Sequence, residues 1–340
     1  MPAIRDSVIV ITGASSGLGR AIALDLAERG ANLVLAARRA EALEDTARAC
    51  HGAGARATAV PTDVTIEAEV DRLAAQAIET YGRIDVWINN AAVTLFAELG
   101  DAPFEEHWRV IETNLMGAML GARAVVPHFR RQHHGVLINV SSVLGEVGHA
   151  FVPSYAISKF GVHGLSEALR VALADEADIH VCTILPYALD TPHFEVAANR
   201  IARAPRALPP MQSPEKVAQA VARLIERPRR VKFVPRSLVL GLAFHRVMPR
   251  SAERLLRAAL ERWHISNDRE RISQGNLFEP PAELARTHGE RPPMIRTPLF
   301  VAWCAQKFVR IQLEAAAHRV RRITARLRPH GHGERALRSA

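Results

Sequence analysis

Short apolar runs recur through the first 235 residues and alternate with longer stretches in which apolar residues have helical spacing. The runs are rich in β-branched residues, so each predicts a strand buried on both faces. The predicted strands span residues 7–12, 32–37, 56–61, 84–88, 136–140, 179–185 and 231–234. The predicted helices span residues 20–29, 40–51, 66–81, 105–132, 152–176 and 214–227. This alternation predicts an α/β fold with a doubly wound parallel sheet.

A glycine-rich turn, residues 13–19, separates the first predicted strand from the first predicted helix. Strand, glycine turn and helix are the context of a dinucleotide site, because glycine lets backbone N–H groups approach a pyrophosphate at the helix N-terminus. A turn that binds no ligand is the alternative. The residues predicted to hold the cofactor here are Thr12, Gly13, Ser15, Ser16, Gly17, Leu18 and Gly19.

The second predicted strand ends at Ala37, where a protein that binds a ribose 2′-hydroxyl would carry an acidic residue. Arg38 follows instead, and a guanidinium can pair with a 2′-phosphate. The pattern therefore favours NADP(H) over NAD(H). The alternative is that Arg38 and Arg39 are a solvated pair at the start of a helix.

Tyr155 and Lys159 lie four residues apart in a predicted helix, so their side chains share one face. A cation beside a tyrosine favours the phenolate and lowers the phenol pKa from its usual value of about 10. Such a tyrosine is suited to general acid/base catalysis. Pairs of this kind also occur by chance on helices, with the lysine solvated.

Together these motifs resemble the short-chain dehydrogenase/reductase family. The family's TGxxxGxG motif matches residues 12–19, and its NNAG motif matches residues 89–92 with Ala92 in place of glycine. Its catalytic tetrad matches Asn114, Ser142, Tyr155 and Lys159. The resemblance covers about two-thirds of the chain and implies a Rossmann-type fold with a nicotinamide cofactor.

The resemblance also implies the roles of the tetrad. Tyr155 exchanges a proton with the oxygen of a carbonyl or alcohol substrate, and Ser142 hydrogen-bonds that oxygen. Lys159 lowers the tyrosine pKa and holds the nicotinamide ribose. Asn114 holds a water beside Lys159. Ser141, the neighbour of Ser142, is taken as secondary.

Further cofactor contacts follow from the same resemblance. Asp63 contacts the adenine and Val64 packs on it, although Asp63 is equally an N-cap candidate for the helix at 66–81. The remaining matched cofactor positions are Asn90, Ala91, Pro186 and Thr191. Tyr187 departs from the family, which has glycine after this proline, and its bulk would narrow the nicotinamide site or shape substrate choice.

Residues 194–211 correspond to the stretch that covers the substrate cleft in the family. Apolar residues alternate there with Arg200, Arg203 and Arg206. A lid of this kind would suit a hydrophobic or lipid-like carbonyl substrate with an acidic end. The alternative is an ordinary amphipathic helix on the core.

The charge of the chain is uneven. Residues 236–340 hold 20 Arg and Lys against 9 Asp and Glu, whereas the whole chain has a net charge of +9. This change of composition sets a boundary between a dehydrogenase/reductase domain at 1–235 and a basic helical extension at 236–340. No metal-ligand spacing, signal peptide or membrane span is present in the sequence, and three scattered cysteines predict a cytoplasmic protein.

Two amphipathic helices are predicted in the extension, at 251–262 and 298–327, together with a short apolar piece at 238–247. They are joined by a Pro-rich loop, and the last residues are expected to be disordered. Three interpretations remain open for these helices: packing on the enzyme or a second subunit, peripheral contact with an anionic membrane, and nucleic-acid binding. No nucleic-acid-binding module accompanies the arginines, so that partner is not expected.

The resemblance thus implies an oxidoreductase that interconverts a carbonyl and an alcohol of a small-molecule substrate, with NADP(H) favoured by Arg38, and by analogy with the family it implies a homo-oligomer. The alternative is a cofactor-binding but weakly catalytic or non-catalytic protein that acts as a regulatory or membrane-associated partner. Tyr187 and the basic extension motivate the alternative.

Overall fold

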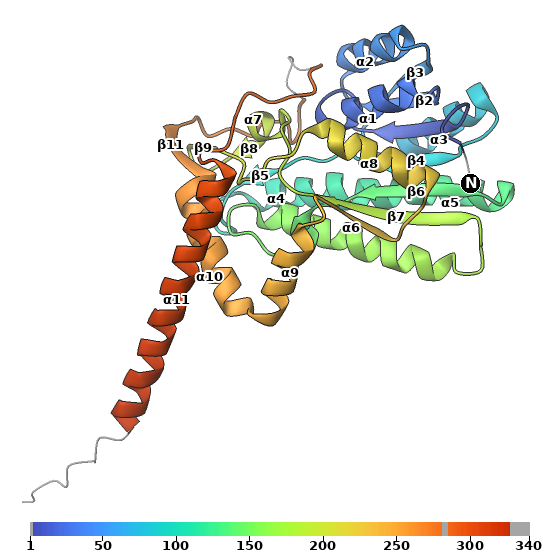
Figure 1. The fold of residues 1–340 in the computed structure, drawn as a ribbon. Coiled ribbons are helices and arrows are strands. Elements are labelled where there is room, and N and C mark those ends of the chain that lie inside the picture. The colour runs from blue at the N-terminus through green and yellow to red at the C-terminus, as the bar shows by residue number, and fades with distance from the viewer. Residues whose placement is uncertain (1–2, 281–284, 327–340) are drawn as a thin grey trace, which may run out of the picture.

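The computed structural model describes residues 3–280 and 285–326, with side chains up to residue 317. At its centre is a seven-stranded parallel sheet with the order β10-β7-β6-β4-β1-β2-β3 (Figure 1). Its strands are β1 (Val8–Thr12), β2 (Asn32–Ala37), β3 (Arg56–Pro61), β4 (Val86–Asn89), β6 (Gly135–Val140), β7 (Ile179–Pro186) and β10 (Val231–Val234). The predicted doubly wound parallel sheet is therefore confirmed.

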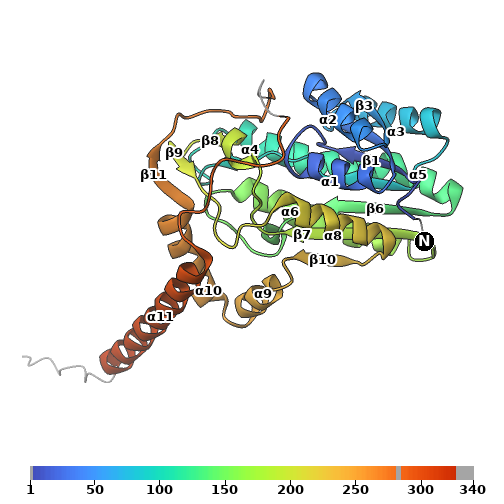
Figure 2. The same cartoon turned by 45° about the horizontal axis from the view of Figure 1, so that its top comes forward.

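Helices cover both faces of this sheet (Figure 2). One face is buried under α1 (Gly17–Glu28), α2 (Ala40–Gly52) and α8 (Pro214–Glu226). The other is buried under α3 (Glu67–Tyr81), α5 (Gly117–Gln132) and α6 (Pro153–Ala172). The strands lie between two apolar layers, which explains why they read as continuous apolar runs. The carboxyl ends of β1, β4, β6 and β7 meet at one edge, where the candidate site lies.

The long helix expected at 105–132 is interrupted. It consists of α4 (Phe104–Ile111), a π-helical turn (Glu112–Met116) and α5. A π-helical turn inserts one extra residue into the helix and is frequent at functional sites. Here it contains Asn114.

Residues 194–211 do not form the amphipathic helix that was the alternative interpretation. They comprise α7 (His193–Val196), β8 (Ala198–Asn199) and β9 (Arg203–Pro205). The short strand β8 pairs with β5 (Leu95–Phe96), so the segment is held by backbone hydrogen bonds rather than by a helical face. Arg200 pairs with Glu106 and Arg206 with Asp268, and neither arginine lines the cleft.

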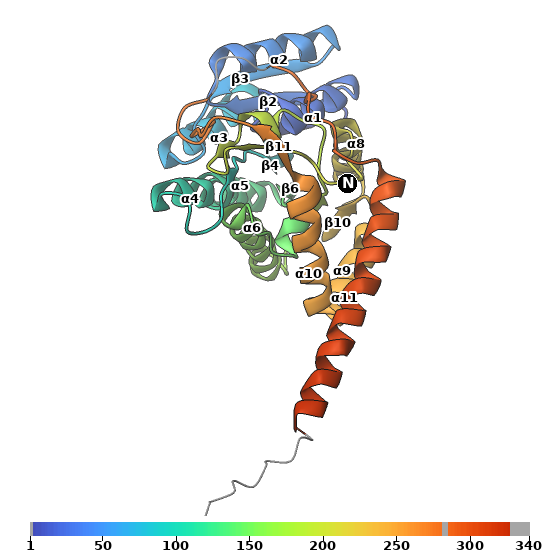
Figure 3. The same cartoon turned by 90° about the vertical axis from the view of Figure 1, so that its left-hand side faces the viewer.

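The extension folds onto the core and then leaves it (Figures 1 and 3). It contains α9 (Leu238–Val247), α10 (Pro249–Ala259), a π-helical turn (Leu260–His264), β11 (Ile265–Arg269) and α11 (Thr297–Arg326). The apolar piece at 238–247 is thus a helix. Strand β11 pairs with β9, and α10 packs against the start of α11. The predicted disordered tail lies outside the described residues.

An apolar cluster joins the extension to the core. Leu256, Leu260 and Trp303 of the extension pack with Phe151 and Tyr187 of the core. Packing of this kind confirms that α10 and the first turns of α11 contact the enzyme itself. Tyr187 replaces glycine at a position where its ring meets this cluster.

No helix of the described residues is long and apolar enough to cross a membrane.

Candidate active site

The glycine turn brings the start of α1 against the end of β1. A Cβ atom at Gly19 would lie 2.1 Å from the Gly13 carbonyl oxygen, and one at Gly13 would lie 2.8 Å from the Cα atom of Ala91. Gly13 and Gly17 also adopt left-handed backbone conformations, with φ of 68° and 54°. The turn therefore requires glycine at these positions, and it aims the first N–H groups of α1 at the cleft.

Thr12 and Asn90 fix the turn to the neighbouring strand end. The Thr12 hydroxyl accepts hydrogen bonds from the backbone N–H groups of Asn90 (3.0 Å) and Ala91 (3.2 Å). The Asn90 side chain donates in return to the Thr12 and Gly13 carbonyls, at 3.0 and 3.2 Å. These four bonds hold β1 and β4 in register at the edge where a cofactor ribose and pyrophosphate would lie.

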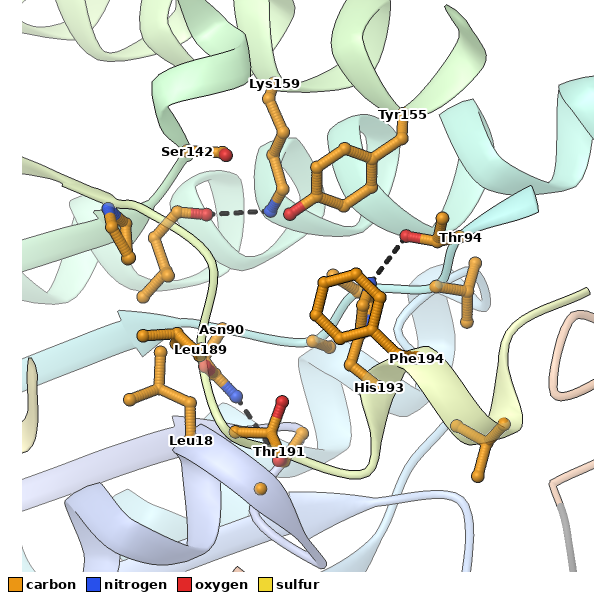
Figure 4. A pocket seen from close by; sticks show the side chains of 18 of the residues that line it. Leu18, Asn90, Thr94, Ser142, Tyr155, Lys159, Leu189, Thr191, His193 and Phe194 are labelled. Carbon is orange, nitrogen blue, oxygen red and sulfur yellow. Dashed lines mark hydrogen bonds between the residues drawn. The ribbon is translucent and has the colours of Figure 1, made fainter. Parts of the chain in front are cut away.

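Ser142, Tyr155 and Lys159 gather along one side of a cleft of about 390 Å³ (Figure 4). The Lys159 ammonium donates to the Val140 carbonyl at 2.8 Å and lies 5.4 Å from the centre of the Tyr155 ring. Ser142 begins a short 3₁₀ turn, and its hydroxyl accepts from the backbone N–H of Leu144 at 3.1 Å. Lys159 is buried, 2% exposed.

Burial dominates the titration of both groups. It raises the pKa of Tyr155 to about 12, while a hydrogen bond with Ser142 acts in the opposite direction. It lowers the pKa of Lys159 to about 8. Burial thus sets the direction of the pKa shift at Tyr155, because it disfavours the charged phenolate, and a lowering of this pKa by Lys159 stays a prediction. Tyr155 is therefore a neutral phenol near pH 7.

Ser141 and Asn114 have other partners. The Ser141 hydroxyl donates to the Lys159 carbonyl at 2.9 Å, inside the protein. The Asn114 side chain accepts from the Val93 N–H at 2.8 Å and donates to the Val93 carbonyl and the Ser158 hydroxyl, both at 3.0 Å. These bonds lock the π-helical turn to the loop after β4, and the water relay through Asn114 stays a prediction.

Asp63 is not an N-cap, because α3 begins at Glu67 and its N-cap is Ile66. Its carboxylate accepts from the N–H and hydroxyl of Thr65, at 3.0 and 2.8 Å, and pairs with Arg109 at 2.9 Å. Burial alone would raise the pKa of Asp63, but these bonds outweigh it and the pKa lies below its usual value. Asp63 and Val64 both line the cleft at the predicted adenine end.

The extension reaches this end of the cleft too. The Arg38 guanidinium donates to the backbone carbonyls of Asn276 (2.6 Å), Leu277 (3.2 Å) and Phe278 (2.8 Å). The Gly17 N–H donates to the Arg286 carbonyl at 2.9 Å. Arg38 is therefore not a solvated arginine, and the extension holds its head in place.

The cleft offers groups that fit the pyrophosphate and the nicotinamide of a dinucleotide. The N–H groups of Leu18 and Gly19 have no hydrogen-bond partner among the described residues, and they lie at the positive end of α1. Pro186 and Thr191 also line the cleft, and Thr191 lies against the glycine turn, where a Cβ atom at Gly17 would come within 3.3 Å of it. Within the described part of the extension, the Arg286 carbonyl accepts a hydrogen bond from the Gly17 N–H of this turn.

The substrate end of the cleft is apolar, with three histidines. Figure 4 shows His193 and Phe194 facing Tyr155, with the His193 ring bonded to the Thr94 hydroxyl at 2.6 Å. Phe96, His149, Phe194, Leu208, Leu256, Leu260 and His264 also line this end. Sequence reasoning identified only the Phe194 and Leu208 stretch. His149 comes from a loop, His193 from the start of α7 and His264 from the extension, and no motif spacing marks them.

The comparisons with known proteins settle the family. The short chain dehydrogenase family model matches residues 7–201. The chain belongs to the short-chain dehydrogenase/reductase family. It is 38% identical to the uncharacterized oxidoreductase YxnA of Bacillus subtilis over 274 residues, covering 78% of this chain and 77% of that protein. Since 78% of the chain exceeds its first 235 residues, this similarity reaches into the extension.

Two further comparisons extend the picture. The 3beta-hydroxysteroid dehydrogenase 1 of Eggerthella lenta is 38% identical over 226 residues, covering 64% of this chain and 86% of that protein. The crystal structure of a short-chain dehydrogenase/reductase from Burkholderia phymatum in complex with NAD superposes with a TM-score of 0.68 at 26% identity, covering 74% of this chain and 96% of that one. As a member of this family, the present protein is thus an NAD(P)-dependent oxidoreductase acting on CH–OH groups.

Proposed function

We propose that this enzyme reduces hydrophobic ketones or aldehydes with NADPH, or oxidises the corresponding alcohols, and that Tyr155 is its general acid/base. One observation carries the proposal. Ser142, Tyr155 and Lys159 line the same cleft as the glycine turn. Beyond them lies the apolar substrate end of the cleft, lined by Phe96, Phe194, Leu256 and Leu260, which we call the chamber. A dinucleotide along the cleft and a carbonyl in the chamber would both reach Tyr155.

The chemistry of the three side chains supports reduction. When bound, the nicotinamide supplies the hydride. Tyr155 is protonated near pH 7 and donates its proton to the carbonyl oxygen as negative charge develops there. Ser142 hydrogen-bonds the same oxygen and stabilises that charge. The pKa of Lys159 is about 8, so Lys159 is positively charged at pH values below 8. Its charge then favours the phenolate that forms when Tyr155 gives up its proton.

The preference for NADP(H) rests on Arg38 and on Ala37, which offers a ribose 2′-hydroxyl no acceptor. The extension carbonyls hold the guanidinium at the end of β2, and a 2′-phosphate there would gain a charge-assisted bond without having to order the arginine. Ser15, bonded to Arg39 at 3.3 Å, adds a hydroxyl on the same side.

The substrate class follows from the chamber wall. Phe96, Phe194, Leu256 and Leu260 line it, and the charged lining residues of the described chain, apart from Lys159, lie at the predicted adenine end. A neutral hydrophobic carbonyl compound suits this wall better than one with an acidic end, because Arg200 and Arg206 form ion pairs with Glu106 and Asp268 and do not line the cleft. The hydroxysteroid dehydrogenase among the relatives supports a bulky alicyclic substrate.

The test is NADPH oxidation at 340 nm with a panel of alicyclic and aliphatic ketones. Tyr155→Phe keeps the ring and removes the proton donor, so we expect kcat to fall by about 10³-fold or more while the NADPH Kd stays within about twofold. The matched control is Tyr81→Phe, a tyrosine on α3 that lies outside the cleft. Turnover that survives in Tyr155→Phe would remove Tyr155 as the acid/base.

We further propose that the enzyme is a homo-oligomer. Met116, Met119, Ile157 and Phe160 are exposed apolar residues on the helices that form the subunit contact in many relatives. Sedimentation of the wild type against Ile157→Glu and Phe160→Glu tests this.

Peripheral membrane contact of the exposed face of α11 also stays a prediction, which vesicle sedimentation of the full chain would check.

A further inference from the structure

His264 is a buried polar side chain for which the described residues offer no well-formed hydrogen bond. It ends the π-helical turn Leu260–His264 of the extension and is 5% exposed. Neither of its ring nitrogens makes a hydrogen bond of good geometry with another described residue, and the neighbouring backbone of Arg206 interacts with the ring so weakly that burial still dominates its pKa. Buried polar groups are bonded in the great majority of cases, so an unsatisfied imidazole requires an explanation.

The surroundings of His264 place it in the chamber wall. It lines the cleft, and its ring centre lies 5.6 Å from that of Phe96, 6.3 Å from that of Phe194 and 5.0 Å from that of His149. The adjoining His193 ring lies 6.1 Å from Phe194 and 5.9 Å from Tyr155. His264 is therefore separated from the proton donor by two aromatic rings, across the apolar part of the chamber.

The backbone fixes this position. The Arg206 N–H donates to the His264 carbonyl at 2.7 Å, and the next residue, Ile265, pairs with Pro205 in the β9–β11 ladder. The imidazole thus projects from a segment that is anchored on both sides. A ligand that bonds to it would not have to order a mobile side chain.

We propose that His264 binds a second, uncharged oxygen of the substrate, remote from the carbon that exchanges hydride. This inference rests on the proposed function and adds a specificity-determining residue from outside the dehydrogenase/reductase core. The substrate class is then a hydrophobic carbonyl or alcohol compound with a hydroxyl, ketone or ether oxygen at its far end.

The electrostatics of the chamber support an uncharged partner. Burial lowers the pKa of His264 to about 4, so the imidazole is neutral near pH 7 and offers one donor and one acceptor. His149 is fixed beside it, because its Nδ1 accepts from the Phe151 N–H at 3.2 Å and its proton is therefore on Nε2. A carboxylate would find no cation at this end among the described residues.

The experiment uses two ketones with the same body, 5α-androstan-3-one and 5α-androstane-3,17-dione, and the same comparison on decalone and a decalindione. Binding is measured calorimetrically to the NADPH complex of Tyr155→Phe, which does not turn over, and KM and kcat are measured on the catalytically intact chain. His264→Phe removes both polar nitrogens and keeps the ring. His264→Gln keeps a donor and an acceptor. The matched control is His107→Phe, since His107 is also buried with two unpartnered ring nitrogens but does not line the cleft.

We expect the dione of the better-accepted pair to bind about tenfold or more tightly than its monoketone, with the difference in KM rather than kcat. His264→Phe should remove the difference, His264→Gln should retain part of it, and His107→Phe should leave it unchanged. The inference is overturned if dione and monoketone bind with equal affinity in both pairs, or if no dione and no monoketone binds. It is also overturned if His107→Phe loses as much of the preference for the dione as His264→Phe does. Binding of the dione that depends on His264, without turnover by the intact enzyme, would instead contradict the proposed function.

Discussion

The core and the extension meet the same cleft in different ways. The core contributes the reactive groups, Ser142, Tyr155 and Lys159, from positions that strand ends and helix starts determine. The extension contributes the wall of the substrate chamber through Leu256, Leu260 and His264, and backbone carbonyls at the opposite end. Local sequence patterns therefore determine where the reactive side chains lie, whereas packing between residues far apart in the chain determines the shape of the substrate chamber.

After Tyr155→Phe, the largest expected effect distinguishes two neighbouring serines of the core. Ser142→Ala should lower kcat by about 10²–10³-fold, because it removes a donor from the developing oxyanion. Ser141→Ala should instead cost about 1 kcal/mol of stability with little change in kcat, because its hydroxyl bonds the Lys159 carbonyl. Steady-state kinetics and urea unfolding of both variants measure this. A larger loss of kcat in Ser141→Ala would contradict the assignment.

The next prediction concerns the pH dependence of stability, which shows whether the extension and the core unfold together. The pKa of His264 is about 4 in the folded protein against 6.5 when exposed, so the unfolded chain binds the extra proton as the pH falls. Its stabilising contribution is complete above pH 6.5 and is lost as the pH falls toward 4, by about 3 kcal/mol in all. His264→Phe should therefore reduce the acid destabilisation of the whole protein, measured by urea unfolding between pH 7 and 4.5.

An unchanged acid profile in His264→Phe, with a separate early transition, would show that the extension unfolds independently of the core.

A smaller effect is expected at the junction. Tyr187→Ala should cost about 2 kcal/mol, because it opens a cavity among Phe151, Leu260 and Trp303. Tyr187→Phe keeps the packing and serves as the control. Thermal unfolding compares the two variants, with NADPH titration beside it. A Tyr187→Ala protein with wild-type stability but altered NADPH affinity would place the tyrosine in the cofactor site.

The sequence predicted most of the core because its signals are local. The parallel sheet, the glycine turn and the family were all readable from runs and motifs over residues 7–191. The misreadings arose where tertiary contacts decide. Arg200 belongs to a segment that pairs with β5, and Asp63 bonds Thr65 and Arg109 instead of capping α3.

The extension was predictable only as amphipathic helices. Nothing local to Arg38 signals that the carbonyls of residues 276–278, some 240 positions later, receive its guanidinium. His264 likewise carries no motif, and only its burial without a well-formed hydrogen bond identifies it. Tyr187 lines the cleft, and its influence on the cofactor or the substrate stays a prediction; the packing of its ring with α10 and α11 is what no local pattern signals.

The most direct measurement is a fluorescence titration of the full chain and of Arg38→Gln with NADPH and with NADH. We expect the wild type to bind NADPH about tenfold or more tightly than NADH, and Arg38→Gln to lose that preference by weakening NADPH alone. An equal loss for both cofactors would mean that Arg38 serves to anchor the extension, and a wild type that binds neither would contradict the proposed enzyme.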